Sequence, residues 1–105
     1  MGFQENLAAL PPADHLVRIE LTGPDGAGAV IENRPGSQGS LRVYQHLAVK
    51  FGRIDAAAAL EGLNLFAEHT DDARLNPGRH PNIDRLLDIR ARGAIWSARL
   101  VATES

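Results

Sequence analysis

The residues best suited to chemistry in this chain lie in a glycine-bearing loop and in the segment that follows it. The run Gly36-Ser-Gln-Gly-Ser40 leads into a stretch with helical periodicity. Backbone N–H groups at a helix N-terminus point toward a ligand, and the helix dipole favours negative charge there. The chemistry suggested is the binding of a small anion, and the candidate residues are Arg34, Gly36, Ser37, Gly39, Ser40, Arg42 and His46.

Arg42 is the residue that favours a ligand over a plain connection. With Ser40 as the N-cap, Arg42 lies in the first turn of the helix, where a cation costs roughly 0.3 to 1 kcal/mol unless an anion sits nearby. No structural gain from this placement is evident. We therefore interpret Arg42 as a guanidinium that donates a pair of hydrogen bonds to a phosphate, sulfate or carboxylate compound. The alternative is a tight connection, because the loop carries neither a P-loop nor a dinucleotide-binding signature.

Basic side chains continue along the same helix at a helical spacing. They are Arg42, His46, Lys50 and Arg53. Residues three or four apart lie on one helix face, so these side chains form a stripe. The stripe either extends the anion site or is a solvated surface, and the sequence leaves both interpretations open.

Other kinds of site have less support. Acidic and histidine side chains gather between residues 68 and 84, but their spacing matches no known metal-ligand pattern. Ser37 and Ser40 lack an identifiable base, so no catalytic residue is assigned. Tyr44 and Trp96 each fall on an apolar face, which predicts core packing. We therefore expect no metal and no cofactor. The clustered side chains are Glu68, His69, Asp71, Asp72, His80 and Asp84.

Composition limits the class of protein. The chain has 105 residues, 44% of them hydrophobic, which suits a single domain over residues 1–105. A formal net charge of -2 gives no general attraction to nucleic acid or to an anionic membrane. The chain has no cysteine, which suits a reducing compartment, and no apolar run of membrane-spanning length. We expect a cytoplasmic protein that binds neither nucleic acid nor membrane.

The first third of the chain predicts a short helix followed by a β-hairpin. Residues 3–10 have near-helical apolar spacing, which a pair of prolines ends. Residues 15–22 alternate in polarity and place Val17, Ile19 and Leu21 on the core face. A Pro-Asp-Gly turn then leads into a second strand at residues 29–33.

The middle of the chain predicts three helices. Their caps and stops give the bounds Ser40 to Gly52, Asp55 to Thr70 and Asn82 to Gly93. In the first helix, Gln45 falls on the solvated face with the basic stripe. In the second, Gly62 costs roughly 1 kcal/mol against alanine, which predicts that another backbone packs close to it.

The last element is predicted to be a strand at residues 94–101, with Trp96, Ala98 and Leu100 on one side and a frayed tail from Ala102. A lone strand could not satisfy its backbone groups, so it must join the hairpin. The expected fold class is α+β, a small three-stranded sheet with helices packed on one face. Neither edge of that sheet carries a proline or a dense charge run, which favours homodimerisation.

Three strings of residues resemble a known family. They are Ile31-Glu-Asn-Arg-Pro-Gly-Ser-Gln-Gly-Ser-Leu41, Ala67-Glu-His69 and His80-Pro-Asn-Ile-Asp-Arg-Leu86. The chain is similar over nearly its whole length to a family of short bacterial proteins that forms a domain of unknown function. The resemblance implies a bacterial, cytosolic, stand-alone domain and transfers no catalytic role.

Two hypotheses about function remain open. The first is a non-catalytic accessory domain that binds a protein, itself included. The second is a domain that binds, or acts on, a small anionic molecule at the loop of residues 34–42. The lack of a catalytic constellation favours the first, whereas a pocket holding Arg34, Ser37 and Arg42 together would favour the second.

Overall fold

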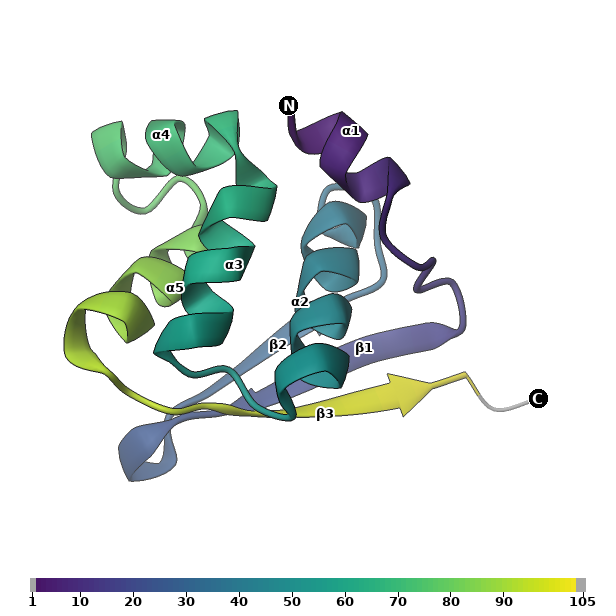
Figure 1. The fold of residues 1–105 in the computed structure, drawn as a ribbon. Helices are drawn as coiled ribbons and strands as arrows, with labels where there is room; N and C mark the ends of the chain where they lie inside the picture. Colours follow the sequence, from purple (N-terminus) through teal and green to yellow (C-terminus); the bar gives the residue numbers. More distant parts are fainter. Residues whose placement is uncertain (1, 104–105) are drawn as a thin grey trace.

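The computed structural model describes residues 2–103, which form helices, strands and one 3-10 turn. Figure 1 shows their arrangement. In chain order they are α1 (Phe3–Ala8), β1 (Leu16–Thr22), η1 (Pro24–Gly26), β2 (Gly28–Glu32), α2 (Gln38–Phe51), α3 (Ala56–Phe66), α4 (Glu68–Leu75), α5 (Pro81–Arg92) and β3 (Ser97–Ala102).

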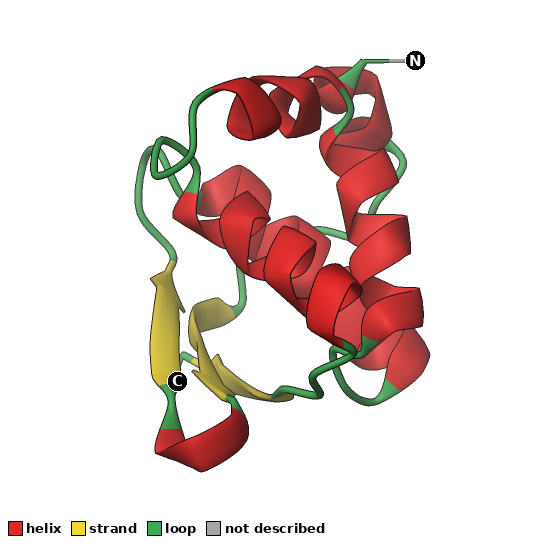
Figure 2. Ribbon diagram, turned by 90° about the vertical axis from the view of Figure 1, so that its left-hand side faces the viewer, coloured by secondary structure: helices red, strands yellow, loops and turns green. Residues whose placement is uncertain are grey.

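The three strands form one antiparallel sheet in the order β2-β1-β3. The C-terminal strand therefore joins the sheet of the hairpin, as predicted, and the strand that it pairs with is β1. In the centre of the sheet, Ile19 lies between Ile31 of β2 and Leu100 of β3. Figures 1 and 2 show all five helices on one side of the sheet, with α1 and α4 farthest from it. The α+β prediction is therefore confirmed.

The predicted inward face of β1 is wrong at its first residues. Val17 is 40% exposed, whereas Leu16 is 2% exposed and lies in the core. Leu16 pairs with Ala102 and Arg18 with Val101, so Val17 is an extra residue in a β-bulge. The bulge reverses the inward and outward positions at that end of the strand, which alternation alone does not predict.

Helix α2 begins earlier than predicted, with Ser37 and not Ser40 as its N-cap. The hydroxyl of Ser37 donates to the carbonyl oxygens of Glu32 at 2.5 Å and Arg34 at 3.2 Å. These bonds close the turn before the helix. The predicted end at Gly52 is confirmed, since Gly52 has a left-handed φ of 76°.

The predicted helix from Asp55 to Thr70 is two helices. Asp55 caps α3 as predicted, accepting from the Ala58 N–H at 2.9 Å. The helix breaks at Ala67, whose φ is 52°. The Thr70 hydroxyl donates to the Leu63 carbonyl at 2.6 Å, and that carbonyl would bond the Ala67 N–H in a continuous helix. The side chain of Thr70 therefore competes with helix continuation.

The space beside Gly62 is filled by side chains and not by a backbone. A Cβ atom at Gly62 would lie 2.8 Å from Cδ1 of Leu86 and 2.9 Å from Cδ1 of Leu47. Leu86 belongs to α5 and Leu47 to α2. The glycine lets leucines of two neighbouring helices meet on α3.

The bounds of α5 and β3 also differ from the prediction. Helix α5 starts at Pro81 with His80 as the N-cap, in place of Asn82, because proline suits the first helical position. It ends at Gly93, as predicted. Ala102 belongs to β3, and the Thr103 N–H donates to the His15 carbonyl at 2.8 Å, so no tail begins at residue 102. The last part of the predicted tail, residues 104–105, lies outside the described residues.

One hydrophobic core lies between the sheet and the helices, and α2 contributes more of its largest fully buried side chains than any other described element. Tyr44 is fully buried there, as predicted, and Trp96 packs partly buried against the core. Gln45 is buried and not solvated as expected, because α2 is covered on that side by the segment after α1. None of the described helices combines the length and the apolar character needed to cross a bilayer.

Candidate functional site

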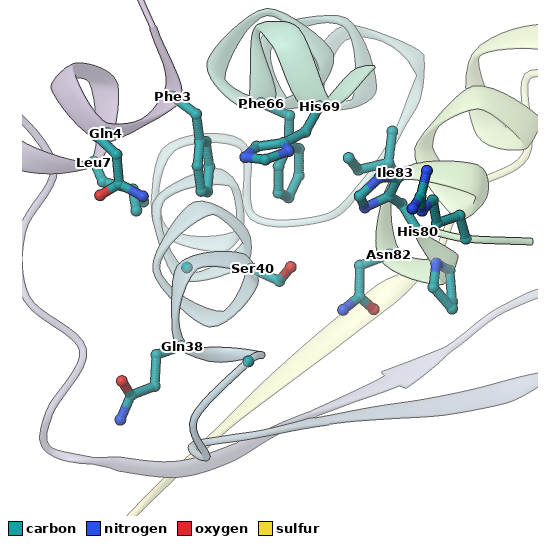
Figure 3. Close-up of a pocket in the computed structure, with 14 residues that line it drawn as sticks. Phe3, Gln4, Leu7, Gln38, Ser40, Phe66, His69, His80, Asn82 and Ile83 are labelled. Carbon is teal, nitrogen blue, oxygen red and sulfur yellow. The ribbon is translucent and has the colours of Figure 1, made fainter. Parts of the chain in front are cut away.

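A cavity of about 420 Å³ lies where α1, the start of α2, the α3–α4 junction and the start of α5 meet. Figure 3 shows the side chains around it. Phe3 and Leu7 form one side, Phe66 and His69 another, and His80, Asn82 and Ile83 the side opposite α1. A volume of this size falls within the range of about 300 to 1,000 Å³ typical of small-molecule sites.

The start of α2 brings free backbone donors to the cavity. Ser37 makes no side-chain cap, because its hydroxyl bonds preceding carbonyls. Within residues 2–103, the N–H groups of Gln38, Gly39 and Ser40 therefore have no acceptor. These are the orphan donors of a first helical turn, which a ligand or water must satisfy. Ser40 points from α2 toward the side of the cavity that holds Asn82 (Figure 3).

Gly39 also sets the distance between α1 and α2. A Cβ atom there would lie 2.9 Å from Cζ of Phe3 and 3.4 Å from Cδ1 of Leu7. The glycine therefore lets α1 approach the first turn of α2. This close approach forms the apolar wall of the cavity.

The start of α5 faces the same cavity. His80 makes no side-chain cap, and Pro81 has no N–H, so the Asn82 N–H is the first donor of this helix. The main-chain oxygen of Asn82 accepts a hydrogen bond of 2.6 Å from the Tyr44 hydroxyl. Its side-chain oxygen accepts one of 3.0 Å from Arg85. The core thus holds the first turn of α5 in place beside the first turn of α2.

Two imidazole rings line the cavity between α4 and α5. The ring centroids of His69 and His80 are 5.7 Å apart, and His69 meets the ring of Phe3 edge-on at 4.9 Å. Nε2 of His80 lies 2.6 Å from a carboxylate oxygen of Asp72. The hydrogen bond from His80, followed by the nearby charge of Arg79, holds the pKa of Asp72 below its usual value. Asp72 is therefore ionised at neutral pH and fixes the orientation of the His80 ring.

The apolar wall is anchored by contacts of α1 with the end of α3 and the start of α4. The rings of Phe3 and Phe66 stack with centroids 5.4 Å apart and planes 15° from parallel. The carboxylate of Glu68 accepts a hydrogen bond of 2.8 Å from the Phe3 N–H. Hydrogen bonds from backbone N–H groups, its own first and then that of Phe3, lower the pKa of Glu68. The charge at the start of α4 thus helps to hold α1 against the cavity.

The structure brings only part of the predicted anion site to this cavity. Gly36, Gly39 and Ser40 line it. Arg34 instead pairs with Glu32 at 3.2 Å. His46 lies 2.5 Å from Glu61, which also pairs with Lys50 at 2.6 Å. Arg34, Ser37 and Arg42 do not share a pocket.

Arg42 has a structural role that the sequence did not reveal. Its guanidinium donates to the carbonyl oxygens of Leu10 at 2.6 Å and Pro11 at 3.4 Å. The Gln45 amide donates to the next carbonyl, that of Pro12, at 3.1 Å. Because α2 begins at Gln38, Arg42 also lies beyond the first turn. The arginine therefore satisfies carbonyl groups that follow α1, and its position needs no anion to explain it.

The titratable side chains that line the cavity, those of His69, Arg79 and His80, were all absent from the predicted anion site. Two of them belong to the cluster at residues 68–84 that was weighed as a metal site. Among the residues that the structure describes, no three acidic or histidine side chains converge to hold a metal ion. The sequence signal that was available is the His80-Pro81 pair, since proline marks a helix start and hence a second set of N-terminal donors.

The fold and the cavity define a small α+β protein whose candidate site is built from helix ends and not from the sheet. The chain belongs to a family of uncharacterized proteins conserved in bacteria (DUF2322), which matches residues 3–100. The family resemblance inferred from the sequence is thereby confirmed. No curated protein and no solved structure shows a significant match to the chain.

Proposed function

We propose that this protein is a non-catalytic accessory domain that binds a small anion with an apolar part in the cavity between α2 and α5. The observation that carries the proposal is that two helices begin at the same cavity with N–H groups that have no acceptor among the described residues. These are three N–H groups at the start of α2, residues 38–40, and that of Asn82 at the start of α5. Each helix start attracts negative charge, and two starts facing one space reinforce each other. The sequence-based hypothesis placed the anion at one helix start with Arg42.

The cavity offers a different chemistry on each side. The N–H groups near Ser40 and Asn82 suit a carboxylate or phosphate group. Arg79 lines the cavity and supplies a positive charge, which the Asp72 carboxylate, 3.6 Å away, balances in part. Phe3 and Phe66 present apolar surface to the remainder of the ligand. A carboxylate or phosphate compound with an aromatic or aliphatic body matches this division.

The proposed role is binding without chemistry. His80 points Nε2 at Asp72, and among the described residues no nucleophile makes a hydrogen bond to its ring. We keep the expected cytoplasmic location, which rests on composition, as part of the proposal. A protein-binding role is supported by a separate feature, the open outer edge of β3.

The proposal is tested by following backbone amide signals in NMR while adding inorganic phosphate, sulfate or benzoate. The amides of Gly39, Ser40 and Asn82 should shift together and saturate, and benzoate should also shift the Phe3 and Phe66 ring signals. Arg79→Ala should weaken binding about tenfold, since it removes the positive charge at the cavity.

Arg74→Ala is the matched control, because Arg74 is about as exposed as Arg79 and also pairs with an aspartate, but it does not line this cavity. It should leave the affinity within about twofold of the unmodified protein. Equal weakening by the two substitutions would indicate general charge attraction and not a site. The absence of saturable shifts at Gly39, Ser40 and Asn82 with all three anions would refute the proposal.

A further inference from the structure

We infer that two copies of this chain associate through the outer edges of β3, antiparallel to each other, so that their three-stranded sheets form one continuous sheet. The inference concerns the sheet and is independent of the cavity between the helices. The two outer edges of the sheet, those of β3 and β2, differ in which backbone N–H and C=O groups already have hydrogen-bond partners.

The outer edge of β3 is closed at one point and open beyond it. Trp96 exchanges two hydrogen bonds with Ile54, of 2.8 and 2.9 Å, on the side away from β1. In an antiparallel strand, the direction of the backbone groups alternates from residue to residue. Ala98 and Leu100 therefore also direct their N–H and C=O groups away from β1. In the described part of the chain, these groups have no partner.

The opposite edge, that of β2, is less available. The outward carbonyl of Glu32 accepts from the Arg34 N–H at 3.0 Å and from the Ser37 hydroxyl at 2.5 Å. The loop before α2 thus covers one end of β2. Among the described residues, this leaves two successive unpaired positions on β2, Gly28 and Val30, whereas β3 has three, Ala98, Leu100 and Ala102. The longer unpaired edge is the better template for another strand.

The Ile54–Trp96 bridge also selects the register between the β3 strands of the two copies. An antiparallel pair centred on Ala98 would place Leu100 opposite Trp96 of the second copy, whose backbone groups are already bonded to Ile54. A pair centred on Leu100 avoids this conflict. It places Leu100 opposite Leu100 and Ala98 opposite Ala102 of the second copy. The two-fold axis then passes between the two Leu100 residues, as a symmetric dimer requires.

The side chains fit this register. On the open face of the sheet, Arg99 lies opposite Val101 of the second copy, so no like charges are directly opposed. The charge of Arg99 is balanced within its own chain by Glu20, 3.5 Å away. On the helix side, Leu100 is only partly buried and gains contact with its counterpart. The alanines at positions 98 and 102 leave room for the incoming strand.

Ala98→Pro is the test variant. Proline at this position removes an N–H that points outward and leaves the bonds between β3 and β1 in place. Analytical ultracentrifugation of the unmodified protein, from about 1 μM to 1 mM, should show a monomer–dimer equilibrium. Ala98→Pro should weaken dimerisation at least tenfold. A protein that stays monomeric over this range overturns the inference.

Val30→Pro is the matched control on the other edge. By the alternation in β2, the Val30 N–H also points away from β1, so this variant should fold and dimerise normally. If Val30→Pro dissociates the dimer and Ala98→Pro does not, the interface is on β2 and the inference is wrong.

Hydrogen exchange in the unmodified protein gives a result that does not depend on any variant folding. The Ala98 and Leu100 amides should exchange more slowly as concentration rises, while the Val30 amide should not change. Concentration-independent exchange at Ala98 and Leu100 would contradict the β3 interface.

Discussion

The Tyr44 hydroxyl donates to the main-chain oxygen of Asn82 at 2.6 Å, and this bond joins the middle of α2 to the first turn of α5. Tyr44 is fully buried, and Arg85 donates to its hydroxyl oxygen at 3.1 Å. The Arg85 guanidinium lies 5.6 Å from the ring centroids of both Tyr44 and Trp96. The two helices that border the cavity are therefore positioned by one buried polar group.

Tyr44→Phe should lower the free energy of unfolding by about 1 to 2 kcal/mol, because it leaves the Asn82 carbonyl without its donor in a buried setting. Chemical denaturation gives the measurement. Ser97→Ala is the control, since its hydroxyl makes an exposed 3.4 Å bond, and it should change stability by less than about 0.5 kcal/mol. Similar stabilities for Tyr44→Phe and the unmodified protein would show that the bond contributes nothing.

Stability should fall as the pH rises from about 10 to about 12. Burial raises the pKa of Tyr44 to about 12, against the opposing effect of Arg85. The unfolded chain releases this proton near pH 10, so the folded state binds more protons in this window. The stabilisation is complete below pH 10 and is lost toward pH 12, by about 1 to 3 kcal/mol.

Tyrosinate absorbance checks this prediction directly, because Tyr44 is the single tyrosine of the chain. The native protein should titrate well above pH 10, and the denatured protein near it. Tyr44→Phe should flatten the dependence of unfolding free energy on pH in this window. A native titration near pH 10 would contradict the prediction.

Arg42→Ala should destabilise the protein by about 1 to 2 kcal/mol, because the Leu10 and Pro11 carbonyls lose a charged donor. If the arginine were only a misplaced surface charge at a helix start, its removal would raise the melting temperature. Arg53→Ala is the control, since Arg53 is exposed and makes a single 3.4 Å pair with Asp55. Thermal unfolding of the two variants distinguishes these outcomes.

Gly23→Ala should cost about 1 to 3 kcal/mol, because a Cβ atom at Gly23 would overlap the rigid indole ring of Trp96. Gly28→Ala provides the comparison on the same hairpin. A Cβ there would meet only the Leu21 carbonyl oxygen, at an ordinary 3.7 Å. Equal effects in chemical denaturation would show that the loss comes from the hairpin backbone and not from Trp96.

Deletion of residues 94–105 should prevent folding. It removes β3, the strand that pairs with β1 along most of its length, and the Trp96 bonds to Ile54. The core would then be open along one side of the sheet. A truncated chain that keeps a cooperative thermal transition would show that β3 is dispensable.

Local patterns were enough to predict most elements, because the causes act within a few residues. Ile19 and Leu21 face the core as alternation requires, Asp55 caps α3, and Gly52 and Gly93 end their helices in the left-handed conformation. That β3 joins the sheet of the hairpin also followed, since an isolated strand cannot satisfy its backbone groups.

The errors have causes that act between segments. The bulge at Val17 depends on how β1 pairs with β3, and the break at Ala67 depends on a bond from Thr70 back to Leu63. The bonds of Arg42 to the Leu10 and Pro11 carbonyls were not predicted, because these acceptors lie more than 30 residues earlier in the chain. The periodicity of a helix in the sequence gives no information about contacts between residues so far apart.

The sequence by itself determined that this protein has an α+β fold, and it indicated one helix start, that after the loop, as a place for an anion. Only the tertiary structure decided that the start of α5 faces the same cavity, with Arg79, His69 and His80 beside it. The physical reason is that the free N–H groups of a helix start arise from residues that are neighbours in the sequence. The convergence of two helix starts on one cavity depends instead on contacts between distant residues. Convergence here depends on the bond between Tyr44 and Asn82 and on the close approach of Phe3 to Gly39, which join residues far apart in the chain.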